Sequence, residues 1–217
     1  MEYLIIALSK GRLAEITLEK FARMGLVFTD YSPKSRKLIF INDEHKIKIV
    51  LVKSGDVTTY VEQGSADIGI VGKDNLLEKK PNVYEIMDLG FGKCKFSIAS
   101  LKNTKPVEDR IIRVATKYPN VTRDYYNKKG EDAEIIYLSG SVELAPLMGL
   151  SDVIVDIVET GTTLRENGLD VIEEISPVSA RVIANRVSFK AKSTSIKKLI
   201  KGLQFEGQNG GKVYENN

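Results

Sequence analysis

The stretch that decides the fold is VIVDIVETGTTLRENGLD, residues 153–170. Its first part, residues 153–158, is apolar and mostly β-branched apart from Asp156, which predicts a buried strand. Small and hydroxyl residues interrupt the run at 159–163, and a short helical turn at 164–167 follows, closed by Gly168. A strand, a small-residue loop and a helix start direct several backbone N–H groups at one point, which favours a bound phosphate.

Two carboxylates, Asp156 and Glu159, stand at the mouth of this loop. They would repel a phosphate if they faced it, but beside it they can accept hydrogen bonds from ribose hydroxyls. The combination suggests a sugar phosphate as ligand. A plain strand-to-helix turn with threonine N-caps explains the local pattern equally well, so other parts of the chain must decide.

A second strand-to-helix loop, Ser9-Lys10-Gly11-Arg12, lies near the beginning of the chain. An apolar strand pattern at 3–8 precedes it, and apolar residues at helical spacing follow from 13 to 24. Glycine permits close backbone approach and the two cations suit a polyphosphate. The alternative is a basic surface turn, although cations at a helix start are mildly unfavourable. A third small-residue loop, Ser139-Gly140-Ser141, precedes a predicted helix at 142–147.

The order of these elements predicts an α/β protein with two lobes. Alternating strands and helices indicate mostly parallel sheets with flanking helices. Glycine-rich residues at 87–95 and the segment 176–180 are the expected crossings, which gives a first lobe of residues 1–92 and 181–217 and a second lobe of residues 93–180. The chain from about residue 206 has few apolar side chains, which predicts a mobile tail. The three loops are expected to face each other across a cleft.

Composition narrows the class of protein. The chain has 217 residues, 42% hydrophobic and 28% charged, as in ordinary soluble proteins, and a net charge of +3 is too small to indicate nucleic-acid binding. Cys94 is the single cysteine, and His45, at the turn of a predicted hairpin, is expected to be solvated. No leader or membrane-spanning run is evident, so we expect a cytoplasmic enzyme or binding protein that does not enter a membrane.

With these features the chain resembles the ATP phosphoribosyltransferases in their short form, the catalytic subunit for the first step of histidine biosynthesis. The resemblance extends from Leu4 to about Lys190 and rests on motifs in a fixed order. They are Ala7-Leu8-Ser9-Lys10-Gly11-Arg12-Leu13, Asp56-Val57-Thr58-Thr59-Tyr60-Val61-Glu62, Ala66-Asp67-Ile68-Gly69-Ile70-Val71-Gly72-Lys73-Asp74, Gly92-Lys93-Cys94-Lys95, Ala115-Thr116-Lys117-Tyr118-Pro119, Gly140-Ser141-Val142-Glu143-Leu144-Ala145-Pro146, and residues 156–168.

The resemblance implies a two-lobe fold similar to type II periplasmic binding proteins, and a pentosyltransferase reaction. N1 of the adenine of ATP attacks C1 of phosphoribosyl pyrophosphate, giving phosphoribosyl-ATP and pyrophosphate. N1 has a free lone pair, so the reaction requires no general base, and positioning and cations supply the catalysis. Mg²⁺ is the expected cofactor, held mainly by substrate phosphates rather than by a dedicated protein site.

The resemblance also implies site residues. The phosphoribosyl pyrophosphate loop would hold the 5-phosphate through Thr160, Gly161, Thr162, Thr163 and Leu164, while Asp156 and Glu159 approach the ribose hydroxyls directly or through Mg²⁺. The ATP and pyrophosphate phosphates would be held by Lys10, Gly11, Arg12, Arg36 and Lys53, whose cations act electrostatically in catalysis. Gly140, Ser141 and Glu143 would shape the second lobe's side of the cleft, although Glu143 is equally explained as a first-turn helix acid. The family commonly has arginine where this chain has Lys53, which leaves the share of that residue in phosphate binding open.

Short forms in this family are homodimers that join a regulatory subunit similar to a histidyl-tRNA synthetase, and the length of this chain suggests the same assembly. Two other functions stay open on sequence grounds. A solute-binding module would have the same fold without catalysis, and a phosphoribosyltransferase could use another base.

Overall fold

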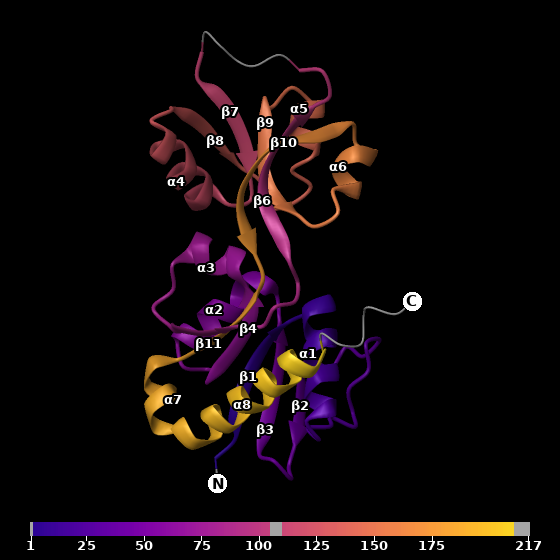
Figure 1. Ribbon diagram of the computed structural model, residues 1–217, viewed down its shortest axis with the longest axis vertical. Helices are drawn as coiled ribbons and strands as arrows, with labels where there is room; N and C mark the ends of the chain where they lie inside the picture. Colours follow the sequence, from indigo (N-terminus) through magenta and orange to yellow (C-terminus); the bar gives the residue numbers. More distant parts are fainter. Residues whose placement is uncertain (1, 105–109, 211–217) are drawn as a thin grey trace. The chain divides into compact units, whose positions relative to one another are not determined.

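The computed structural model describes residues 2–104 and 110–210 and divides the chain into two compact units (Figure 1). Unit 1 is built from the residues up to Leu76, from Lys80 to Gly92 and from Ser179 onward. Unit 2 is built from Leu77–Lys79 and Lys93–Val178. Each unit has its own sheet with helices on both faces, which confirms the α/β class.

Unit 1 contains a six-stranded sheet in the order β2-β3-β1-β4-β11-β5. The three central strands β3, β1 and β4 are parallel, whereas β2, β11 and β5 run antiparallel to their neighbours. The strands are β1 (Leu4–Ser9), β2 (Ile39–Asn42), β3 (Ile47–Val52), β4 (Ile68–Gly72), β5 (Tyr84–Asp88) and β11 (Ala180–Ala184).

Helices cover both faces of this sheet (Figure 1). On one face α1 buries Ala14, Leu18 and Phe21, spaced so that they share one side of the helix, and α8 packs beside it through Ile196 and Leu199. On the other face α2 and α3 close a second apolar cluster. The helices of the unit are α1 (Arg12–Arg23), α2 (Ser54–Glu62), α3 (Lys73–Lys79, whose end belongs to unit 2), α7 (Arg186–Ala191) and α8 (Ser193–Gly210).

Unit 2 contains a five-stranded sheet in the order β10-β6-β9-β7-β8, in which β9, β7 and β8 are parallel. Helix α4 covers one face, and α5 and α6 cover the other (Figure 1). The elements are β6 (Cys94–Leu101), β7 (Ile112–Thr116), α4 (Pro119–Lys129), β8 (Ala133–Tyr137), α5 (Leu144–Leu147), β9 (Val153–Val158), α6 (Thr162–Glu166) and β10 (Leu169–Val178).

The structure corrects two features of the predicted fold. Both sheets are mixed rather than mostly parallel, because β11, β5, β6 and β10 pair antiparallel. The expected tail from about residue 206 is also wrong up to Gly210, since α8 continues to that residue; residues 211–217 of that prediction lie outside the described part of the chain. Among residues 2–104 and 110–210, no helix is long and apolar enough to cross a membrane.

An ion cluster at the start of β9 anchors the strand that carries the decisive stretch. Asp152 is almost buried, with a side chain 10% exposed, and accepts hydrogen bonds from Arg110 Nη1 and Nη2 at 2.8 and 2.7 Å and from the Arg113 backbone N at 2.8 Å. Arg113 Nη2 donates to the same carboxylate at 3.0 Å. The Arg110 hydrogen bonds, followed by those of Arg113, hold the pKa of Asp152 well below its ordinary value.

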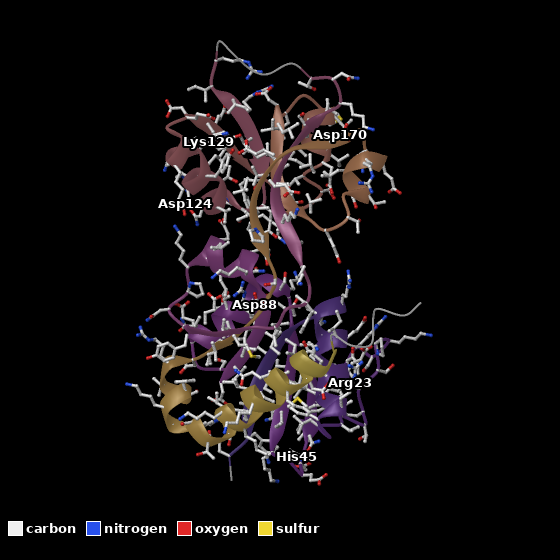
Figure 2. The ribbon with its side chains drawn as sticks, viewed as in Figure 1. Arg23, His45, Asp88, Asp124, Lys129 and Asp170 are labelled. Atoms are coloured by element: carbon white, nitrogen blue, oxygen red, sulfur yellow. The ribbon has the colours of Figure 1, made fainter. Side chains whose placement is uncertain are left out.

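Asp152→Asn is therefore expected to lower the free energy of unfolding at pH 7 by about 2 kcal/mol, since it removes charge-assisted hydrogen bonds. Because the folded-state pKa of Asp152 is lowered, its contribution to the free energy of unfolding is present above the unfolded-state pKa of about 4. That contribution is lost as the pH falls from there toward the folded-state pKa. Urea unfolding of both proteins at pH 7 and at lower pH should show the difference shrinking. Asp170→Asn is the control, because Asp170 lies on the surface (Figure 2), 4.0 Å from Lys102. Equal losses in the two variants would contradict a special role for the cluster.

Candidate functional site

The decisive stretch folds as a strand, a tight turn and a short helix. β9 ends at Val158, and Gly161 is the N-cap of α6 with φ +70°, in the left-handed region that favours glycine. The N-cap is this glycine and not a threonine, so the interpretation with a threonine N-cap is wrong, although the Thr160 hydroxyl approaches the first backbone N of α6. Gly168 follows the C-cap with φ +74°, which confirms it as the helix stop.

The loop of residues 159–164 is held to the sheet by one buried side chain, and its hydroxyl side chains are exposed to solvent. Leu164 is 5% exposed and packs with Ile154 and Leu169 against the sheet. Thr160, Thr162 and Thr163 are exposed. The hydroxyls of Thr160 and Thr162 lie 3.1 Å apart, and the Thr162 backbone N is 3.4 Å from Thr160 Oγ1. An exposed row of hydroxyls around a glycine offers hydrogen-bond donors to an anion.

The two predicted carboxylates differ in surroundings. Asp156 is half-buried in β9, pairs with Ser97 of β6, and accepts a hydrogen bond from the Ile157 backbone N at 2.8 Å. Glu159 is exposed directly after the strand. Both are oxygen ligands of the kind that Mg²⁺ prefers. In residues 2–104 and 110–210 there is no group of three or more His, Cys, Asp or Glu that could hold a metal ion.

The loop that contains Gly140 and Ser141 lies at the same edge of the unit 2 sheet. β8, β7 and β9 are parallel neighbours, so their carboxyl ends meet at one edge, and Leu138 N donates to Thr116 O at 3.0 Å there. Ser141 has φ +48°, an uncommon conformation for a residue with a Cβ. Glu143 is half-buried at the N-cap of α5 and makes no side-chain cap hydrogen bond.

In unit 1 the sheet also brings its predicted residues to one edge. Ser9 of β1 pairs in register with Val52 of β3, and Lys10 N donates to Val52 O at 2.9 Å, so Lys10 and Lys53 follow neighbouring strand ends. Gly11, with φ +96°, is the N-cap of α1, and Arg12 is the first residue of that helix. Lys10, Arg12 and Lys53 are all exposed.

Arg36 lies in the segment that enters β2. Leu51 N donates to Leu38 O at 2.8 Å, which places this segment beside the carboxyl end of β3, at the edge where Lys53 begins α2. The Arg36 side chain is exposed. The six-stranded sheet therefore gathers Lys10, Arg12, Arg36 and Lys53 at one edge. That the loops of unit 1 face those of unit 2 stays a prediction.

Two further residues are placed by the structure. His45 is exposed at the turn between β2 and β3 (Figure 2), where its Nδ1 lies 3.2 Å from Asn42 Oδ1, which agrees with a solvated residue.

Arg165 was missed from the sequence as a residue that contacts the loop of residues 159–164. Its guanidinium donates to Thr160 O at 2.9 Å and to Thr162 Oγ1 at 3.2 Å. Its position three residues after Thr162 in a predicted helical turn was the available signal.

Comparisons with known proteins decide the family. A family model described as ATP phosphoribosyltransferase matches residues 53–205. An ATP phosphoribosyltransferase from Lachnoclostridium phytofermentans is 54% identical over 208 residues, which cover 94% of this chain and 97% of that protein. The chain belongs to the ATP phosphoribosyltransferase family. Another ATP phosphoribosyltransferase, from Clostridioides difficile, is 54% identical over 205 residues, with 93% and 97% covered.

Comparison with solved structures agrees with this family assignment. The ATP phosphoribosyl transferase (HisG:HisZ) complex from Thermotoga maritima contains a chain that is 36% identical with a TM-score of 0.83, covering 95% of this chain and 99% of that one. The periplasmic aliphatic sulphonate binding protein SsuA from Escherichia coli has a TM-score of 0.62 at 14% identity, covering 95% of this chain and 69% of that one, which shows a shared fold alone. The predicted likeness to periplasmic binding proteins is confirmed.

As an ATP phosphoribosyltransferase, the chain is a pentosyltransferase of the first step of histidine biosynthesis. It transfers the phosphoribosyl group from phosphoribosyl pyrophosphate to N1 of the adenine of ATP and releases pyrophosphate. Family membership therefore excludes the solute-binding module and the use of another base as the function of this chain.

Proposed function

We propose that the loop of residues 159–164 in unit 2 holds the 5-phosphate of phosphoribosyl pyrophosphate. The observation that carries this proposal is the turn at Gly161, whose left-handed backbone is flanked by the exposed hydroxyls of Thr160, Thr162 and Thr163. Hydroxyl and backbone N–H groups are donors, and phosphate oxygens are acceptors only. Leu164 takes part by fixing the helix start to the sheet. Asp156 and Glu159, as acceptors, suit the ribose hydroxyls beside the phosphate.

The cations at the edge of unit 1 are proposed to bind the pyrophosphate and the ATP phosphates. Lys10, Arg12, Arg36 and Lys53 come from adjoining strand ends and are exposed to solvent. Gly11 allows the backbone between the first two to approach a phosphate. Lys53 supplies charge without the planar fork of an arginine. Gly140, Ser141 and Glu143 are proposed to shape the unit 2 side of the site.

The proposed chemistry requires positioning more than proton transfer. N1 of adenine attacks C1 of the ribose while the bond from C1 to the pyrophosphate oxygen breaks, so positive charge develops on the ribose and negative charge on the leaving group. Lys10, Arg12, Arg36 and Lys53 stabilise the negative charge, and the loop of residues 159–164 holds the ribose phosphate still. Asp156 and Glu159 orient the ribose through its hydroxyls.

Mg²⁺ is the proposed cofactor, and it neutralises part of the pyrophosphate charge when bound. Asp156 and Glu159 are the residues of unit 2 that would contact the ion, with most of its ligands coming from substrate phosphates and water. Chelation with EDTA is expected to reduce the rate of pyrophosphate release by more than about 100-fold, because a cation that offsets leaving-group charge is lost. Adding Mg²⁺ back should restore the rate, and a rate that is unchanged after chelation would contradict the proposal.

The proposed assembly is a homodimer that joins a regulatory subunit similar to a histidyl-tRNA synthetase. Support comes from the Thermotoga maritima relative, whose structure is a HisG:HisZ complex. The decisive experiment measures pyrophosphate release from ATP and phosphoribosyl pyrophosphate with Mg²⁺, for this chain alone and with such a subunit added. Full activity together with inhibition by histidine in the chain alone would overturn the need for the subunit. No pyrophosphate release under either condition would instead overturn the proposed site.

A further inference from the structure

The guanidinium of Arg165 lies across the turn that contains Gly161. Nη1 donates to the Thr160 carbonyl oxygen at 2.9 Å, and Nη2 donates to Thr162 Oγ1 at 3.2 Å. The Arg165 backbone N also donates to Gly161 O at 3.0 Å. One residue of α6 therefore contacts each of the three residues of the turn.

These two hydrogen bonds form a planar fork from the guanidinium, which restrains an exposed turn. The direct contacts between Thr160 and Thr162 are long, at 3.1 Å between hydroxyls and 3.4 Å from backbone N to hydroxyl. A Cβ at position 161 would lie 3.0 Å from Arg165 Nη1, so the guanidinium lies directly against the glycine. The fork therefore restrains the backbone carbonyl on one side of the glycine and the hydroxyl on the other.

The fork also determines what Thr162 can offer. Because Nη2 donates to Thr162 Oγ1, one lone pair of that oxygen is occupied and its hydrogen is available for donation, to Thr160 Oγ1 or to a phosphate oxygen. The two acceptors of the fork, the Thr160 carbonyl oxygen and Thr162 Oγ1, are both uncharged.

We propose that Arg165 is a positioning residue of the phosphoribosyl pyrophosphate loop, whose planar fork holds Thr160 and Thr162 in the phosphate-binding conformation. This inference rests on the proposed role of the loop in binding the 5-phosphate. It assigns Arg165 no contact with the reacting atoms. The fork, and not the charge alone, is the feature that positions the loop, so lysine cannot replace arginine here.

The test compares Arg165→Met and Arg165→Lys with Arg123→Met as the matched control, in the presence of the regulatory subunit if activity requires it. Arg123 is an exposed arginine of the same unit whose guanidinium also contacts a neutral oxygen, Asn120 Oδ1 at 3.0 Å. Both Arg165 variants are expected to raise KM for phosphoribosyl pyrophosphate by about 10-fold or more, with KM for ATP changed less than about 2-fold. The control should leave both constants near those of the parent. An Arg165→Lys protein with the KM of the parent would overturn the role of the fork.

A second measurement separates a role of Arg165 in positioning the loop from a role in global stability alone. Arg165→Met should melt within about 3 °C of the parent, since an exposed contact contributes little to global stability, yet phosphoribosyl pyrophosphate should no longer raise its Tm as it does for the parent. A large fall in Tm with both KM values raised together would overturn the proposal in favour of general destabilisation.

The double variant of Arg165→Met with Thr162→Val separates the inference from the proposal on which it rests. If Arg165 acts through Thr162, the double variant should raise KM for phosphoribosyl pyrophosphate little more than Arg165→Met alone. Fully multiplicative effects would overturn that coupling. Should Thr162→Val alone leave the KM unchanged, the assignment of the loop to the 5-phosphate would fail. An effect of Thr162→Val without any effect of Arg165→Met would overturn only the positioning role.

Discussion

Gly161→Val is expected to lower kcat/KM for phosphoribosyl pyrophosphate by at least about 100-fold, which corresponds to about 2.7 kcal/mol of lost transition-state stabilisation. Gly161 has φ +70°, where a β-branched side chain is strained. Its new Cβ would lie 3.0 Å from Arg165 Nη1, so the guanidinium that contacts Thr160 and Thr162 would have to shift by a few tenths of an ångström. The isopropyl group would also occupy space beside the exposed hydroxyls, where the 5-phosphate is proposed to bind. Steady-state kinetics with varied phosphoribosyl pyrophosphate measures the effect.

The matched control is Gly130→Val in the same unit. Gly130 is the C-cap of α4 with φ +72° and open space around the position of a Cβ, so valine is strained there to the same degree. It precedes β8, at the edge of the sheet opposite the end of β9. We expect Gly130→Val to lower Tm while leaving KM for phosphoribosyl pyrophosphate near the parent value. If Gly161→Val also kept near-parent affinity, the loop would not be the phosphate site.

The strand and turn around Gly161 could be predicted from sequence because local chemistry determines them. A β-branched apolar run specifies a buried strand, and glycines at 161 and 168 specify left-handed positions, which is what the structure has. The same holds for Gly11 before α1, where apolar residues at helical spacing define the helix. In both places the signal lies within a few residues of the chain.

Long-range pairing could not be predicted in the same way. β10 carries Glu173, Glu174 and Pro177, is mostly exposed, and contains two irregularities in its register with β6, so its sequence lacks the alternation of an ordinary strand. Its pairing depends on β6, which begins at Cys94, 75 positions before β10 begins at Leu169. In the antiparallel ladder Leu169 lies opposite Leu101. The antiparallel pairing of β11 with β4 is likewise a property of the return of the chain to unit 1.

Side-chain contacts within the candidate site were predicted only in part. Residue types identified Lys10, Arg12 and the threonines, because charge and hydroxyl groups suit phosphate whatever their exact geometry. The bridge from Arg165 depends on the rotamer of a long side chain around a turn, which no local pattern specifies. The sequence could place Arg36 only by resemblance, whereas the pairing of β2 with β3 explains why its segment reaches the edge where Lys53 lies.

Arg12→Ala is expected to lower kcat/KM for ATP by about 10- to 100-fold, because one charge-assisted contact to phosphate contributes roughly 1.5–3 kcal/mol. Arg12 is exposed and is the first residue of α1, directly after the left-handed Gly11. A cation at a helix start is unfavourable to the helix dipole, so its removal costs α1 nothing through the dipole. A Tm close to that of the parent separates the kinetic effect from a folding defect. Initial rates with varied ATP at saturating phosphoribosyl pyrophosphate give the constant.

Arg23→Ala is the control in the same helix, since Arg23 is exposed at the other end of α1 (Figure 2). It removes the same charge from the chain, so it accounts for any long-range electrostatic effect on the approach of ATP. Arg23 favours the helix dipole at the C-terminus, and its removal should cost Tm slightly while leaving kcat/KM for ATP within about 2-fold of the parent. If both variants lost activity equally, net charge and not a contact from Arg12 would be responsible. Unchanged kinetics for Arg12→Ala would remove this residue from the site, and the edge of the unit 1 sheet would then have to act through Lys10, Arg36 and Lys53.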